Sequence, residues 1–262
     1  MALRLPDLVQ SHIFFFGIWE PHITAFINDR LSAGSIFIDV GANVGYYTLL
    51  AAQIVGDEGH VVAIEASPSV FKQLQRNLDL NGFQNVTLCN EAASDSEGTL
   101  KVFLNDESNL GASSTVPLIA HTRNQLFEAE VPARTLLAIV GKERLLNARM
   151  IKIDVEGAEA SVIRGILDLL GFFSERTEWI FEVTFSAATD EGFSAAHLLD
   201  AFRNAGYNLY RILSESSVLD SYLAGESNYV LAELSDVYKS EAIDVVASKT
   251  ILLRTPDMVQ ND

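Results

Sequence analysis

Residues 37–52 of the chain read FIDVGANVGYYTLLAA, and this stretch decides how the rest is interpreted. An apolar run ends on Asp39, passes through Gly41 and Gly45, and then resumes with apolar residues at helical spacing. Glycine permits positive φ angles and lets a ligand approach the backbone closely. Ligands of open α/β sheets bind beyond the carboxyl ends of the strands. The stretch therefore predicts a strand, a ligand-binding turn and a helix.

The same alternation of strand and helix patterns continues along the chain. The predicted strands are 35–40, 60–65, 85–90, 149–155, 178–184, 207–213 and 228–234. The predicted helices are 46–54, 67–82, 158–170, 194–205 and a tail helix over about 235–246. This order predicts an α/β fold with a mostly parallel sheet and helices on both faces. The last two strands lie close enough in sequence to form an antiparallel edge.

No internal repeat and no Pro- or Ser-rich linker divides the 262 residues. We therefore expect one domain over 1–262, with 1–34 as an N-terminal helical extension. Residues 94–131 are richer in Ser, Asn, Asp and Gly than the segments around them and form a variable insert region.

Composition excludes several classes of protein. A net charge of −17 disfavours a nucleic-acid partner, because phosphate binding requires clustered Lys and Arg. No apolar run approaches the roughly 20 residues of a membrane helix, and the N-terminus lacks the pattern of a signal peptide. The lone Cys89 excludes an intrachain disulfide and a cysteine-cluster metal site. These features predict a cytoplasmic protein without a membrane partner.

The turn after the first strand favours one kind of nucleotide over another. A dinucleotide site has the pattern G-x-G-x-x-G, whereas this chain has Ala42 at the middle glycine and Asp39 at the strand end. An acid there repels a pyrophosphate and attracts an amino-acid ammonium. Glu65 ends the next strand, where a carboxylate can accept both hydroxyls of a ribose. The pattern favours S-adenosylmethionine, with a nucleotide-dependent oxidoreductase as the alternative.

Four segments of the chain resemble a known family. They are FIDVGANVGYYT (37–48), IEASPSVFKQLQRNLDLNG (64–82), NEAASD (90–95) and IKIDVEGAEASVIRG (151–165). In these segments the chain resembles the FkbM family of S-adenosylmethionine-dependent methyltransferases, and the resemblance runs from Trp19 to Glu182. It implies the class I, Rossmann-like methyltransferase sheet of seven strands with a reversed edge strand. It also implies O-methylation of a hydroxyl on a sugar, a polyketide or another small molecule. Relatives often carry Pro-Asn or a similar pair at Ala66-Ser67, a departure that affects only the contacts beside Glu65.

The residues expected around the cofactor lie at three strand ends. They are Asp39, Gly41, Asn43 and Gly45 around the methionine portion, Glu65 with Ser67 at the ribose, and Glu91 with Ala92 at the adenine edge. An ordinary surface turn is the alternative for the last pair.

The expected catalytic residues are carboxylates at the fourth and fifth strand ends. A hydroxyl nucleophile needs a base, or a metal that lowers its pKa. Asp154, Glu156 and Glu182 are the candidates, and the alternative is that they only bind loop amides or Lys152. Glu159 is expected to be a first-turn helix acid. Asp154 and Glu182 could hold Mg²⁺ through oxygen ligands, but metal dependence is not expected.

Three further features are candidates for a role at the site. The resemblance gives Glu20 a site role, and a helix-start acid is the alternative. The loop 109–114 could close over the cofactor or be a flexible loop. Among the histidines, His121 is the candidate to face substrate, and an ordinary surface histidine is the alternative. A methyltransferase-like domain that binds without turnover is a third functional hypothesis, and a homo-oligomer is a further possibility. The acceptor itself has no informative motif.

Overall fold

The computed structural model describes residues 1–184, 194–214, 222, 228–234 and 242–252. The helices are α1 (Leu8–Phe16), α2 (Pro21–Arg30), α3 (Tyr46–Val55), α4 (Pro68–Asn81), α5 (Pro117–Thr122), α6 (Leu136–Val140), α7 (Lys142–Leu146), α8 (Glu159–Arg164) and α9 (Ala195–Asn204), with 3₁₀ turns η1 (Leu110–Ala112) and η2 (Leu167–Phe172). The strands are β1 (Ile36–Val40), β2 (His60–Ile64), β3 (Val86–Cys89), β4 (Ala92–Ala93), β5 (Gly98–Leu104), β6 (Leu126–Arg134), β7 (Met150–Ile153), β8 (Glu178–Thr184), β9 (Asn208–Ser214), β10 (Tyr229–Glu233) and β11 (Ala242–Ser248).

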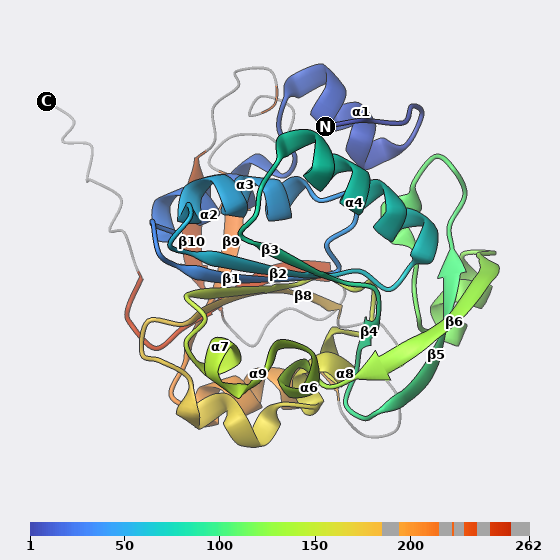
Figure 1. Cartoon of the computed structure of the whole chain (residues 1–262). Helices are drawn as coiled ribbons and strands as arrows, with labels where there is room; N and C mark the ends of the chain where they lie inside the picture. Colours follow the sequence, from blue (N-terminus) through green and yellow to red (C-terminus); the bar gives the residue numbers. More distant parts are fainter. Residues whose placement is uncertain (185–193, 215–221, 223–227, 235–241, 253–262) are drawn as a thin grey trace, which may run out of the picture.

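A central sheet of eight strands has the order β10-β9-β11-β8-β7-β1-β2-β3. The pairs from β3 to β8 are parallel, whereas β11 is antiparallel to both β8 and β9, and β10 is antiparallel to β9. Helices α2, α3 and α4 lie on one face, and α6 to α9 on the other (Figure 1). The predicted α/β class with a mostly parallel sheet and helices on both faces is confirmed.

The central strands are apolar on both sides, because both faces of the sheet are covered. In β1, Phe37, Ile38 and Val40 are fully buried. One core joins the sheet to α6–α9 and includes Trp179, Phe181 and Phe202, whose rings stack or meet edge to face. The other core joins the sheet to α2 and α3. This burial of apolar surface is the main stabilising contribution to the fold.

The prediction of a tail helix over 235–246 is wrong within its described part. Residues 242–248 form β11, which lies between β8 and β9, and residues 235–241 fall outside the described part of the chain. The β-branched run of Ile243, Val245 and Val246 packs well in a sheet and is buried there. Two described strands of the central sheet run opposite to the others: β11 inside the sheet, and β10 at its edge. The predicted antiparallel edge of the strands over 207–213 and 228–234 is the β9–β10 pair, and β11 makes the sheet eight-stranded.

A small second sheet is formed by the insert region and the residues that flank it. Strands β4, β6 and β5 form it in that order, with β5 and β6 antiparallel, and it lies beside the carboxyl ends of the central strands (Figure 1). The predicted N-terminal helical extension contains α1 and α2. Across the described residues, no helix combines the length and apolarity needed to cross a membrane.

Candidate active site

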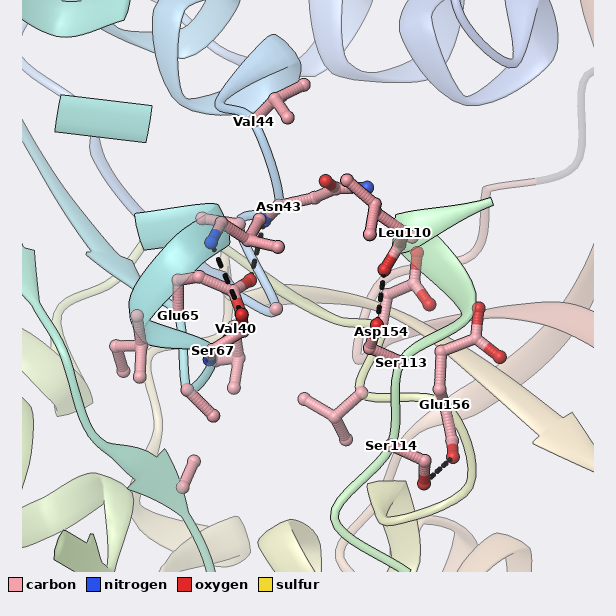
Figure 2. A pocket seen from close by; sticks show the side chains of 18 of the residues that line it. Val40, Asn43, Val44, Glu65, Ser67, Leu110, Ser113, Ser114, Asp154 and Glu156 are labelled. Atoms are coloured by element: carbon pink, nitrogen blue, oxygen red, sulfur yellow. Dashed lines mark hydrogen bonds between the residues drawn. The ribbon is translucent and has the colours of Figure 1, made fainter. Parts of the chain in front are cut away.

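A cleft opens at the carboxyl ends of β1, β2 and β7, where the insert and α1 also meet (Figure 2). It holds about 910 Å³ of atom-free space, part of it open to solvent. Its walls comprise strand-end residues, insert residues, two residues from the N-terminal extension and two tyrosines from α3. The lining includes Val40 to Val44, Glu65 to Ser67, Glu91 to Ala93, Leu110, Gly111, Ser113 to Thr115, Lys152, Asp154 to Glu156, Val9, Trp19, Tyr46 and Tyr47.

The turn after β1 has a backbone shape that depends on its glycines. Gly41 has φ +83°, and a Cβ there would overlap the carbonyl oxygen of Asp154 at the end of β7. Gly45 has φ +92°, and its Cβ would lie 2.6 Å from a methyl carbon of Leu74. Asn43, between them, also adopts a left-handed φ of 49°. This strained, close-packed turn leaves its backbone facing the cleft.

Glu65 connects this turn to the second strand end. Its carboxylate accepts the Asn43 N–H at 2.9 Å and the Ser67 N–H at 2.8 Å, as Figure 2 shows. Burial raises the pKa of Glu65 to about 7, against the lowering effect of these two hydrogen bonds. A carboxylate has about four acceptor positions, so two backbone donors leave capacity for a ligand. Glu65 and Asn43 thus form one wall of the cleft.

Ser67 and the adenine-edge candidates also line the cleft. The Ser67 hydroxyl accepts the Val70 N–H at 3.2 Å as the N-cap of α4 and donates to Glu128. Ala92 is buried in β4, and Glu91 pairs with Arg134 at 3.5 Å. Both flank the space beyond Glu65.

Asp39 occupies a different place from the one the sequence suggested. Its carboxylate is 1% exposed, accepts the Thr48 hydroxyl at 2.6 Å and is not part of the cleft lining. Burial raises the pKa of Asp39, and nearby Lys152 opposes that shift. Asp39 supports the turn from behind, where it anchors α3 through Thr48.

Asp154 and Lys152 form an ion pair at the floor of the cleft. The Lys152 ammonium donates to Asp154 at 2.7 Å, and the side chains are 4% and 38% exposed respectively. Burial alone would lower the pKa of Lys152, but the attraction of neighbouring carboxylates, Asp154 first, raises it above the ordinary value. Asp154 therefore presents a carboxylate to the cleft with a buried cation behind it.

Glu20 lies beside this pair on the short segment before α2. Its φ is 41°, and its carboxylate accepts the Tyr47 hydroxyl at 2.7 Å. Burial, followed by repulsion from Asp244, raises the pKa of Glu20 to about 7. Tyr47 also has its ring 4.9 Å from the Lys152 ammonium. Tyr47 falls within the helix predicted over 46–54, and no motif in the sequence marks it as a site residue.

Glu156 faces the insert. Its carboxylate pairs with Arg123 at 2.7 Å, and its carbonyl oxygen accepts the Ser114 hydroxyl at 2.8 Å. Burial raises the pKa of Glu156, and the hydrogen bond from Arg123 opposes the shift. Leu110, Gly111, Ser113 and Ser114 of the loop 109–114 line the cleft, whereas His121 is exposed on α5 and is not part of the lining.

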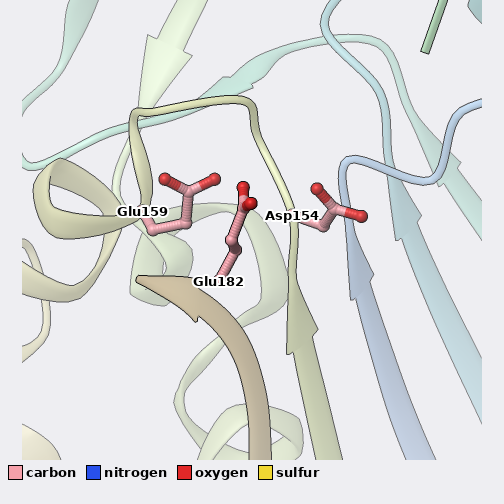
Figure 3. A group of neighbouring side chains, drawn as sticks. All are labelled: Asp154, Glu159 and Glu182. Carbon is pink, nitrogen blue, oxygen red and sulfur yellow. The ribbon is translucent and has the colours of Figure 1, made fainter. Parts of the chain in front are cut away.

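Glu182 lies beside Asp154 and is not part of the cleft lining. It sits between Asp154 and Glu159 in Figure 3, and one oxygen from each of the three carboxylates lies within 4.8 Å of the others. Glu159 accepts N–H groups from Val155 and Gly157, so it binds the loop as well as starting α8. Burial and repulsion from Glu159 raise the pKa of Glu182 to about 8. Oxygen ligands of this kind suit Mg²⁺ or Ca²⁺.

Comparison with known proteins gives a family match over residues 39–209, to the methyltransferase FkbM domain. Methyltransferase 1 of Beauveria bassiana is 26% identical over 148 residues, 51% of this chain and 59% of that protein. Methyltransferase sdnD of Sordaria araneosa is 26% identical over 187 residues, 60% of this chain and 70% of its own. The protein-L-isoaspartate O-methyltransferase of Ignicoccus hospitalis is 34% identical over 73 residues, 27% of this chain and 35% of its own. The chain thus spans less than two thirds of the first and last of these relatives.

Solved structures with a similar fold include methyltransferase FkbM from Methylobacillus flagellatus KT. It is 14% identical with a TM-score of 0.43, covering 87% of this chain and 50% of that one. A SAM-dependent O-methyltransferase from Thermotoga maritima is 14% identical with a TM-score of 0.48, covering 96% and 74%.

Proposed function

The chain belongs to the FkbM methyltransferase family, and from that premise we propose that it transfers a methyl group from S-adenosylmethionine to a hydroxyl of a small molecule or sugar. The small-molecule or sugar acceptor, the absence of a nucleic-acid or membrane partner and a cytoplasmic location belong to this proposal. The high negative charge supports the exclusion of nucleic acids.

The donor set of the cleft fits S-adenosylmethionine. Gly41 and Gly45 place no side chain at the two ends of the turn after β1, and the Glu65 carboxylate has acceptor capacity left for ribose hydroxyls. Glu91, Ala92 and Ser67 would flank the base. Asp39, with its negative charge behind the turn, would attract the ammonium through space rather than by contact. The bound cofactor would supply an electrophilic methyl group.

The chain's own residues would position the acceptor hydroxyl and receive its proton. Asp154 is the carboxylate of the ion pair that faces the cleft, so we assign it the acceptor proton. Lys152 fixes the Asp154 carboxylate in place. Glu182 lies beside Asp154, and its pKa, raised to about 8, keeps it protonated near neutral pH, so we do not assign it the acceptor proton.

The observation that carries the proposal is the Glu65 carboxylate hydrogen-bonded to the glycine turn at the wall of the cleft. Calorimetric titration with S-adenosylhomocysteine tests it, with NADH as the matched control ligand. We expect micromolar binding of S-adenosylhomocysteine and none of NADH, and the reverse would favour a nucleotide-dependent oxidoreductase.

A screen of hydroxylated acceptors with isotopically labelled cofactor, read by mass spectrometry, tests the direction of transfer. A methyl group on oxygen is expected. Transfer to nitrogen or carbon would overturn the O-directed assignment, and binding without turnover across the screen would favour a non-catalytic binding domain.

A further inference from the structure

The turn 155–158 after β7 contacts the insert through its backbone as well as through the Glu156 side chain. A Cβ on Gly157, whose φ is +98°, would overlap the side chain of Ile119 on α5. The Ser114 hydroxyl donates to the Glu156 carbonyl oxygen at 2.8 Å. Helix and loop of the insert therefore both rest directly on this turn.

The Glu156 carboxylate takes part in the same contact. Its Oε2 accepts from the Arg123 guanidinium at 2.7 Å, and the same nitrogen of Arg123 also donates to the Ala112 carbonyl oxygen at 3.2 Å. Gln125 donates to that carbonyl as well, at 2.6 Å. Arg123 thus ties Glu156 to the part of the insert that lines the cleft.

Backbone strain points to the same conclusion. Glu156 has a φ of 54°, a left-handed conformation that non-glycine residues adopt at a cost. In this conformation its carboxylate meets Arg123 and its carbonyl meets Ser114. The strain is maintained by contacts to the insert, and Arg123 occupies one oxygen of the carboxylate, Oε2.

Resting on the proposed function, we propose that Glu156 is a positioning residue whose ion pair with Arg123 fastens the insert over the bound cofactor. Residues Leu110, Gly111 and Ser113 to Thr115 line the cleft, so fastening the insert completes the wall opposite the glycine turn. The role of proton acceptor then belongs to Asp154, and Glu156 acts through Arg123.

A double-mutant cycle tests the pair. Arg123→Ala, Glu156→Ala and the double variant are titrated with S-adenosylhomocysteine, and hydrogen exchange of residues 105–125 is measured in the same proteins without ligand. We expect each single variant to weaken binding about fivefold, as a half-exposed pair implies, and the double variant to be no weaker than the singles. Exchange in 105–125 should rise in all three variants, with β1 and β2 unchanged.

Two further variants separate this role from general damage. The charge-reversed double variant Arg123→Glu with Glu156→Arg should recover part of the lost affinity. Arg203→Ala removes an arginine of similar exposure that pairs with Asp200 outside the cleft lining, and it should bind like the wild type.

The outcomes divide cleanly. If both single variants kept the wild-type affinity for S-adenosylhomocysteine and the wild-type hydrogen exchange in 105–125, the proposal that the Arg123–Glu156 pair fastens the insert would be overturned. Additive losses of affinity in the double variant would overturn it too. A Glu156→Ala protein with normal affinity and normal exchange but a large loss of turnover would make Glu156 the base. Absence of S-adenosylhomocysteine binding by the wild type would overturn the proposed function, while the exchange data on the unliganded proteins would still decide the fastening.

Discussion

The two walls of the cleft are built in different ways. The glycine wall, residues 40–45 and 65–67, comes from one β-α-β unit and is held by backbone hydrogen bonds and close packing. The insert wall, residues 110–115 with 154–156, joins distant segments and is held mainly by side-chain contacts. Since backbone packing tolerates less change than half-exposed ion pairs, damage to the glycine wall should abolish binding or folding. Damage to the insert wall should alter rates and selectivity.

The largest expected effect is that of Gly41→Ala. The added Cβ would overlap the Asp154 carbonyl oxygen at a φ of +83°, so we expect a loss of more than about 3 kcal/mol in the free energy of unfolding. Urea denaturation measures it. Gly171→Ala, where a Cβ would meet nothing within 4 Å, is the matched control. Equal stability of the two variants would mean that the turn can shift to accommodate a Cβ at position 41.

Asp154→Asn is expected to reduce kcat on the acceptor found by the screen by about 10²- to 10³-fold, because a general base is removed. Affinity for S-adenosylhomocysteine should stay within about threefold of the wild type, since the amide keeps the shape of the side chain. Steady-state kinetics and calorimetry measure the two quantities. A variant with full turnover would remove Asp154 from the chemistry.

Glu65→Ala is expected to weaken S-adenosylhomocysteine binding by about 100-fold, the effect of losing charged hydrogen bonds to a ligand. Calorimetry measures the change, and Glu97→Ala, on an exposed turn, is the control. Binding at wild-type strength would show that the ribose is held elsewhere, and the glycine wall would lose its central contact.

Glu182→Gln should change the pH dependence of stability. The pKa of Glu182 is raised to about 8 in the fold from an ordinary 4.5, so between these values the folded protein holds a proton that the unfolded chain has lost. Its contribution to stability therefore falls as pH rises from about 4.5 to 8. Above pH 8 we expect the variant to be more stable than the wild type by about 1–2 kcal/mol. Thermal unfolding at pH 5 and pH 9 measures this, and a difference that grows toward acid pH would contradict it.

Removal of divalent metal should have the smallest effect. Lys152 already neutralises Asp154, and Glu159 binds two backbone amides, so the three carboxylates have little need of an ion. Turnover with EDTA should remain within about twofold of that with added Mg²⁺. A loss restored by Mg²⁺ would assign the carboxylates of Figure 3 to a metal site.

The glycine wall could be predicted from the sequence because its signals are local. Gly41, Gly45 and Glu65 follow two strands whose apolar runs are unmistakable, and each strand end falls within a residue of its prediction. The class of the fold followed from the same alternation.

The insert wall could not be predicted to the same depth. Arg123 and Glu156 are 33 positions apart in the sequence, and no local pattern around either residue predicts that the two form an ion pair. Tyr47 satisfies the apolar pattern of α3 and still bonds to Glu20. Asp39 was placed at the ligand on charge alone, whereas its short side chain points at Thr48. Charged residues before the β-branched run give this segment a pattern typical of a helix, so the sequence predicts a helix where the structure has β11.

The position of β11 has a consequence for synthesis on the ribosome. Strands β8 and β9 leave the exit tunnel before β11, yet they are joined in the sheet only through it. Until residues 242–248 emerge, both strands expose an unpaired edge to other nascent chains. We therefore expect the β3-to-β8 half of the sheet to assemble first during translation, with closure of the other half delayed until β11 is available.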